Sequence, residues 1–190
     1  DFIHVVGLVQ FNSFPWINRI PKSIVVGIAN VDRKRDFIFP SSLAAEQKRY
    51  PGAGKSADFI AFIETELQPY IDRTYKTSQS RTLIGESAGG LLATEILLEK
   101  PALFNRYIIV SPSIWWDDAS ILKRNSALLD EAFTRQTDIY IGVGKEGLAP
   151  TDIPHVMEVD ANLLVEKLNS TKSKSVHVYY DYLPDENHAT

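Results

Sequence analysis

The feature that most constrains this chain is the segment Gly85-Glu86-Ser87-Ala88-Gly89, which has the pattern G-x-S-x-G. A strand-like run from Thr82 to Ile84 precedes it, and a strongly apolar, helix-like run follows it up to Pro101. In a sharp strand-to-helix turn of this kind the serine is strained and its hydroxyl is exposed, while small neighbours let other backbone pass close by. The pattern therefore predicts a nucleophilic serine, Ser87, at the carboxyl end of a strand.

Short apolar runs rich in β-branched residues alternate along the chain with segments of helical periodicity. The expected strands cover residues 23–28, 82–84, 106–110, 138–144 and 175–183, and further helices are expected over residues 2–14, 57–75, 121–133 and 154–168. Such alternation is typical of an α/β fold with a mostly parallel, doubly wound sheet and helices on both faces, a three-layer αβα arrangement. At 190 residues we expect one domain, residues 1–190.

Composition and charge exclude several classes of protein. The chain is 44% apolar, carries a net charge of −4 and contains no cysteine. Disulfides and thiolate chemistry are therefore excluded, and a nucleic-acid partner is not expected because such proteins usually present a basic face. No apolar run reaches the roughly 18 residues of a membrane span. The sequence assigns neither a compartment nor an oligomeric state, and since it begins with Asp1, a signal peptide could precede it.

A serine nucleophile needs a base, and the chain has four histidines. His188 lies in the loop beyond the last expected strand, at the sheet edge where open α/β sheets gather their reacting groups. His4 precedes the serine, against the order serine, acid, histidine that is usual for this turn. His155 begins an expected helix and His177 lies within a strand, where a structural role is usual. The sequence predicts His188 as the base of Ser87.

The acid that orients the imidazole should follow the strand at 138–144. The loop after that strand offers Glu146 and Asp152, and we favour Glu146 because it lies two residues past the strand. A serine–histidine pair without an acid is the alternative. The histidines show no metal-ligand spacing, so we expect neither a metal nor a cofactor.

An oxyanion hole for this turn needs two donors, one of which is the backbone N–H of Ala88. The second normally follows the third strand of the fold. Because the strand expected at 23–28 counts as the fourth, we expect the third strand and the second donor to lie upstream of Asp1. The chain would then be a fragment of a longer protein.

The chain resembles the putative-esterase branch of the α/β-hydrolases, the esterase D-like family, and within it the siderophore-esterase (IroE-like) members. The resemblance runs through residues 24–28, 33–36, 66–71, 81–90, 111–116 and 186–188. It implies an α/β-hydrolase fold, with Ser87 matching the family nucleophile and His188 the family base. Glu86 departs from the family, where histidine is frequent at that position.

The resemblance also implies where substrate would lie. Trp115 and Trp116 would flank the site, although adjacent tryptophans are more often structural. The loop with Arg33 and Arg35 is either a solvated charged surface or part of a substrate pocket that meets anionic or catecholate groups.

The leading functional hypothesis is hydrolysis of a small-molecule carboxylic ester through an acyl-enzyme on Ser87. The first alternative is acyl transfer to an alcohol or thiol on the same fold. The second is a catalytically silent binding domain that keeps the hydrolase fold.

Overall fold

The computed structural model describes residues 2–188 and divides into two compact units, Asp1–Val31 and Asp32–Thr190. The first unit contains helix α1 (Phe2–Asn12), as expected from the apolar spacing. The strand expected at 23–28 is wrong: these residues have no strand assignment, and Ile24, Val26 and Ile28 are 48%, 43% and 39% exposed. A β-strand exists only as part of a hydrogen-bonded ladder, and among the described residues this segment pairs with no other strand.

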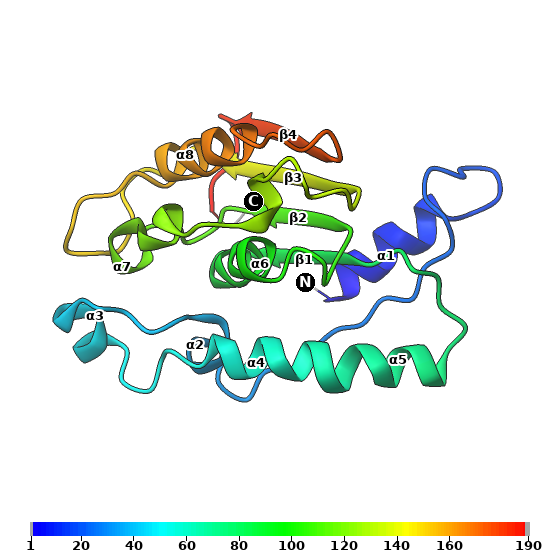
Figure 1. The fold of residues 1–190 in the computed structure, drawn as a ribbon, viewed down its shortest axis with the longest axis horizontal. Helices are drawn as coiled ribbons and strands as arrows, with labels where there is room; N and C mark the ends of the chain where they lie inside the picture. Colours follow the sequence, from blue (N-terminus) through cyan, green and yellow to red (C-terminus); the bar gives the residue numbers. More distant parts are fainter. Residues whose placement is uncertain (1, 189–190) are drawn as a thin grey trace. The chain divides into compact units, whose positions relative to one another are not determined.

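The second unit is built on a parallel sheet of four strands in the order β1-β2-β3-β4 (Figure 1). The strands are β1 (Thr82–Glu86), β2 (Arg106–Val110), β3 (Thr137–Gly144) and β4 (Val176–Leu183). In the register, Glu86 aligns with Val110, Val110 with Gly142, and Gly142 with Asp181. The carboxyl ends of all four strands therefore meet at one edge, and the mixed α/β class with a parallel sheet is confirmed.

Helices precede the first strand and connect the strands that follow. They are α2 (Arg33–Phe37), α3 (Ala44–Arg49), α4 (Ser56–Phe62), the π-helical turn η1 (Ile63–Leu67), α5 (Gln68–Thr74), α6 (Ala88–Glu99), α7 (Trp116–Ala119) and α8 (Met157–Asn169). Because the strands follow one another in sequence order and parallel crossovers are right-handed, α6 and α8 pack on the same face of the sheet. None of the helices among residues 2–188 has the length and apolar character needed to cross a bilayer.

The core lies between this face of the sheet and α6. Leu91, Ile96 and Leu97 on the helix, and Tyr107 and Ile109 on β2, are fully buried. Residues 90–98 of α6 are all buried, and because all but Gly90, Thr94 and Glu95 are apolar, the segment lacks the single apolar stripe of a surface helix. Burial on both sides holds the start of α6 in place behind the turn at Ser87.

The helix expected at 121–133 is also wrong. This region contains only two short 3₁₀ turns, η2 (Ser120–Lys123) and η3 (Ala127–Leu129). Asp117, Asp118 and Ala119 just before it have φ values of 53°, 51° and 52°, in the left-handed region that breaks a right-handed helix. The apolar pattern still marks buried positions, because Ile121 and Leu128 are fully buried.

Candidate active site

Ser87 lies between β1 and α6 with φ 56° and ψ −119°. This conformation is rare for a residue with a side chain and costs about 1–3 kcal/mol. Backbone packs closely around it, since a Cβ on Gly85 would lie 2.2 Å from the carbonyl oxygen of Gly89. A Cβ on Gly90 would lie 2.9 Å from Cα of Pro112. The tight positions are thus Gly85 and Gly90, whereas a Cβ on Gly89 would meet only a Phe37 ring atom at 3.8 Å.

The structure brings Ser87, His188 and Glu146 together at the carboxyl edge of the sheet. Nε2 of His188 lies 3.1 Å from Oγ of Ser87, and Nδ1 lies 2.6 Å from Oε2 of Glu146. The imidazole is 44% exposed, whereas the Glu146 side chain is 1% exposed. The hydroxyl, the imidazole and the buried carboxylate therefore form one hydrogen-bonded chain, which is buried at the carboxylate and exposed to solvent at the imidazole.

Sequence reasoning missed Ser111, the residue that directly follows β2. Its hydroxyl donates a hydrogen bond to Oε1 of Glu146, and the backbone N–H of Gly144 donates to the same oxygen at 3.3 Å. Ser111 has φ 46°, a second strained position at this edge of the sheet. The only signal in the sequence is a small polar residue at the carboxyl end of a buried strand.

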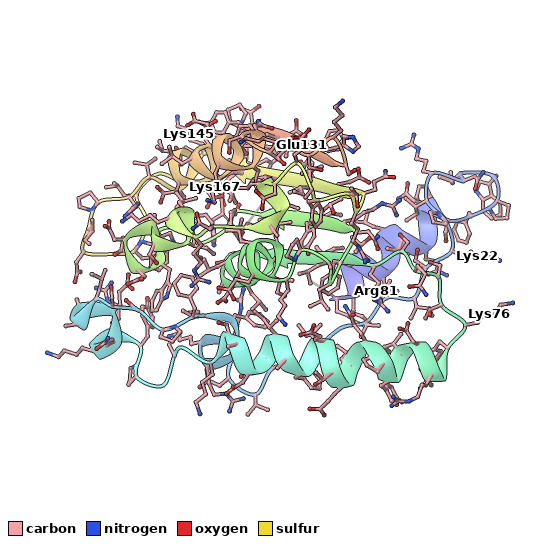
Figure 2. All side chains as sticks on the ribbon, viewed as in Figure 1. Lys22, Lys76, Arg81, Glu131, Lys145 and Lys167 are labelled. Carbon is pink, nitrogen blue, oxygen red and sulfur yellow. The ribbon has the colours of Figure 1, made fainter. Side chains whose placement is uncertain are left out.

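The loop that carries His188 is anchored by backbone hydrogen bonds. The N–H of Lys145, which is labelled in Figure 2, donates to the carbonyl of Glu186 at 2.8 Å. The N–H of Glu186 in turn donates to the carbonyl of Leu183 at 3.1 Å. Gly144 permits this approach, since a Cβ there would lie 2.7 Å from the Glu186 oxygen. The two loops that carry Glu146 and His188 are therefore held against each other.

Ala88 is the first residue of α6, so its N–H has no intrahelical acceptor and stands at the positive end of the helix dipole. Arg33 also lies near the turn, because its Nη2 donates to the carbonyl of Glu86 at 3.3 Å. Arg35 instead pairs with the neighbouring Asp36, whose Oδ1 is 2.7 Å from its Nε. Of the two arginines, Arg33 contacts the strand that leads into Ser87.

The two adjacent tryptophans differ in environment. Trp116 is 2% exposed and its indole N–H donates to the carbonyl of Phe39 at 2.9 Å, so it packs in the core. Trp115 is 8% exposed, and its indole nitrogen has no hydrogen-bond partner among the described residues.

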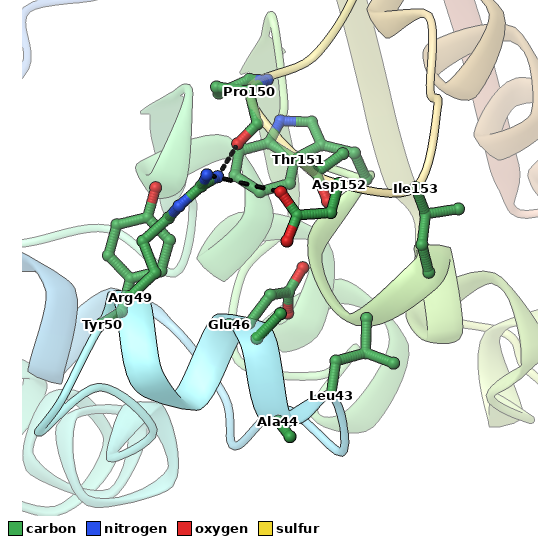
Figure 3. A pocket seen from close by; sticks show the side chains of 11 residues that line it. Leu43, Ala44, Glu46, Arg49, Tyr50, Pro150, Thr151, Asp152 and Ile153 are labelled. Carbon is green, nitrogen blue, oxygen red and sulfur yellow. Dashed lines mark hydrogen bonds and ion pairs between the residues drawn. The ribbon is translucent and has the colours of Figure 1, made fainter.

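Asp152, the alternative acid, pairs with Arg49 at 3.4 Å on the surface (Figure 3), whereas Glu146 contacts His188. Within residues 2–188 no group of His, Asp or Glu side chains is arranged to hold a metal ion.

Fold and site together define an α/β-hydrolase, with a strained serine between a parallel strand and a buried helix. Residues 14–187 match the family described as "Putative esterase". The chain belongs to that family.

Solved structures and characterised relatives agree with this assignment. The chain is similar to an IroE-like serine hydrolase from Shewanella oneidensis, with a TM-score of 0.81 and 29% identity over 99% of this chain and 61% of that one. It is 35% identical to the ferri-bacillibactin esterase BesA of Bacillus subtilis over 64% of this chain and 40% of that protein. It is 36% identical to the siderophore triacetylfusarinine C esterase of Aspergillus fumigatus over 52% of this chain and 33% of that protein. The chain therefore spans less than half of each of these two relatives.

Proposed function

We propose that this protein hydrolyses carboxylic esters through an acyl-enzyme on Ser87, with His188 as general base and Glu146 as the orienting acid. The observation that carries the proposal is the 3.1 Å separation between Nε2 of His188 and Oγ of Ser87. An ionised carboxylate can only accept hydrogen bonds, so Glu146 favours the tautomer with its proton on Nδ1. Nε2 is then left free to accept the serine proton.

In the proposed reaction Nε2 of His188 takes the proton as Oγ of Ser87 attacks the ester carbonyl carbon. The negative charge that develops on the carbonyl oxygen is stabilised by the N–H of Ala88 at the start of α6. The C–O bond then breaks, and the leaving alcohol receives the proton from His188. Water attacks the acyl-serine by the same route, which releases the acid and restores the serine hydroxyl.

Relatives named as siderophore esterases suggest the substrate. Both BesA and the triacetylfusarinine C esterase are named for esters of iron-binding siderophores. We propose an ester of this class as the substrate of the present protein. The leaving group would then be the siderophore fragment that carries the new hydroxyl, and deacylation would release the fragment that carries the new carboxylate.

Labelling by a fluorophosphonate, which reacts with activated serines, tests the reaction. The wild-type protein should be labelled at Ser87, Ser87→Ala should not, and His188→Ala should react at least about 10³-fold more slowly because the base is lost. An unlabelled wild-type protein that hydrolyses neither p-nitrophenyl acetate nor a catecholate trilactone would overturn the proposal in favour of a silent binding domain. Hydrolysis of the acetate alone would retain the esterase and reject the siderophore substrate.

A further inference from the structure

Strand β4 is the last strand of the sheet, so one of its edges pairs with β3 and the other has no strand beside it within residues 2–188 (Figure 1). Natural proteins usually block such an edge with lysine, proline, a bulge or a covering helix, because unpaired backbone groups invite another strand. β4 contains neither lysine nor proline, and its register with β3 is continuous from Val176 to Leu183. The edge is therefore long and regular enough to accept a further strand.

The alternation of the backbone groups identifies the residues that form this edge. The N–H of Thr137 in β3 donates to the carbonyl of Ser175 at 2.9 Å, so Ser175 directs its backbone carbonyl toward β3. Successive residues of a strand direct their N–H and C=O groups to opposite sides. The residues of β4 whose backbone groups point away from β3 are therefore Val176, Val178, Tyr180 and Tyr182.

Exposed charges of opposite sign lie at the two ends of this strand. The titratable side chains within residues 172–177 are all basic and exposed, and they are Lys172, Lys174 and His177. Those within residues 181–186 that carry a charge are all acidic and exposed, and they are Asp181, Asp185 and Glu186. A parallel second copy would place like charges together, whereas an antiparallel copy places each basic end beside an acidic end. The charges therefore favour an antiparallel second copy of this chain.

One antiparallel register satisfies both the backbone groups and the charges. A two-fold axis at Tyr179 sets Val178 opposite Tyr180 of the second copy, and both residues have the outward backbone groups that such a pair exchanges. The same axis sets His177 opposite Asp181 of the second copy. That pair is of the non-hydrogen-bonded kind, in which the two side chains approach most closely.

Both side chains of this charge pair can take a further partner. Nδ1 of His177 lies 3.1 Å from Oδ1 of Asp138, which leaves Nε2 to donate to the second copy when the imidazole is protonated. Burial and the nearby Asp181 carboxylate raise the pKa of the Tyr140 hydroxyl, and a carboxylate has room to accept further hydrogen bonds. The pair can therefore form between copies while each side chain keeps its neighbour within the chain.

We propose that two copies of this chain associate through antiparallel pairing of their β4 edges about a two-fold axis at Tyr179, so that one sheet continues into the other. The interface is isologous, and each pair on one side of the axis is repeated on the other. Pairing through one strand makes a small interface, so Kd should be on the order of 10 µM. The association does not depend on the proposed ester hydrolysis.

Cysteine cross-linking tests the register, because the chain has no cysteine of its own. Tyr179→Cys should form a disulfide-linked dimer under mild oxidation, since opposite residues in a non-hydrogen-bonded pair have Cα atoms about 4.5 Å apart. His177→Cys alone should not, because the two copies of residue 177 would lie about 13 Å apart, beyond the reach of a disulfide. A mixture of His177→Cys and Asp181→Cys proteins should cross-link, and Glu66→Cys, on η1 far from β4 (Figure 1), measures random collision.

Sedimentation measures the association without a cross-link. The wild-type protein should pass from the mass of one chain to that of two as its concentration rises from about 1 to 100 µM. Asp181→Lys should raise Kd about tenfold or more, because the favourable pair with His177 is lost on both sides of the axis. Glu66→Lys makes the same change in net charge away from the edge and should leave Kd unchanged.

The cysteine variants keep the proposal testable if Asp181→Lys folds poorly, because Tyr179 is 57% exposed and its replacement opens no cavity in the core. A wild-type protein that stays at the mass of one chain at about 100 µM would overturn the proposal. So would a dimer in which Tyr179→Cys cross-links no faster than Glu66→Cys, or one in which a folded Asp181→Lys associates as tightly as wild type.

Discussion

Ser111 donates a hydrogen bond to one carboxylate oxygen of Glu146 while the other oxygen lies 2.6 Å from Nδ1 of His188. The serine stands at the end of β2 and the glutamate follows β3, so two neighbouring strands of the sheet hold the carboxylate from opposite sides. The Glu146 carboxylate can rotate only by giving up one of these bonds. The orientation of the carboxylate toward the imidazole is therefore set by the Ser111 hydroxyl together with the backbone N–H of Gly144.

Ser111 should accordingly act as a positioning residue. Ser111→Gly, which keeps the left-handed backbone accessible, should lower kcat by about tenfold with little change in KM, because one hydrogen bond to Glu146 is lost. Ser111→Asn, which tolerates φ 46° and can still donate, should recover part of the rate. A Ser111→Gly protein with an unchanged kcat would show that Gly144 holds the carboxylate alone.

Glu146→Gln should lower kcat by about 10²-fold or more, because an amide can donate to Nδ1 and so favours the wrong imidazole tautomer. Steady-state kinetics on p-nitrophenyl acetate measures the effect. Glu131→Gln, at an exposed carboxylate outside the site (Figure 2), is the matched control and should retain the wild-type rate. Equal rates for Glu146→Gln and wild type would identify a serine–histidine pair that needs no acid.

Two glycines of the turn should respond in opposite ways to alanine. Gly85→Ala should destabilise the protein by about 3 kcal/mol or more, because the new Cβ would lie 2.2 Å from the backbone oxygen of Gly89. Gly89→Ala has room at 3.8 Å and lies in the first turn of α6, so it should be neutral or stabilising by up to about 1 kcal/mol. Urea unfolding of both variants distinguishes the two positions, and equal destabilisation would contradict the packing described here.

Asp117 should make the stability depend on acid pH. Burial acts to raise the pKa of its carboxyl, but hydrogen bonds from Ser120, Ser42 and Ser41 outweigh burial and hold the pKa below its usual value. A lowered pKa in the folded protein adds stability above about pH 4, and this stability is lost as pH falls through the folded-state value. Asp117→Asn, which tolerates the left-handed backbone, should cost about 2 kcal/mol at neutral pH. Unfolding curves should show this difference shrinking toward about pH 3.

His155 should contribute in the opposite pH range. Its Nδ1 lies 2.9 Å from Asp160 and its Nε2 lies 3.2 Å from Asp118. Burial acts to lower the pKa of His155, but hydrogen bonds and charges of these two aspartates outweigh burial and raise it. A raised pKa gives stability that is complete below about pH 6.5 and is lost as pH rises through the folded-state value. The difference in free energy of unfolding between wild type and His155→Gln should therefore be larger at about pH 6 than at about pH 9. A difference that grows with pH would contradict a stabilising ion pair between His155 and the two aspartates.

The sequence by itself determined the turn at Ser87, the four strands of the sheet and the helix that follows the turn. These features depend on neighbouring residues: small glycines, a continuous apolar run and the alternation of strands with helices. The order of the strands also predicted which loops meet, because the carboxyl ends of parallel strands share one edge. Together with the usual order serine, acid, histidine, this favoured His188, and Glu146 was favoured over Asp152 of the same loop because it lies two residues past the strand.

Only the tertiary structure decided the features that depend on residues far apart in the chain. Residues 23–28 have the composition of a strand but no ladder partner within residues 2–188, and residues 121–133 have helical spacing but follow a left-handed turn. That turn is held by Asp117, which accepts hydrogen bonds from Ser41 and Ser42 more than seventy positions earlier. Ladder pairing and buried hydrogen bonds are set by what folding brings alongside a segment. The local pattern therefore predicted burial of Ile121 and Leu128 without their backbone conformation, and at residues 23–28 it predicted neither.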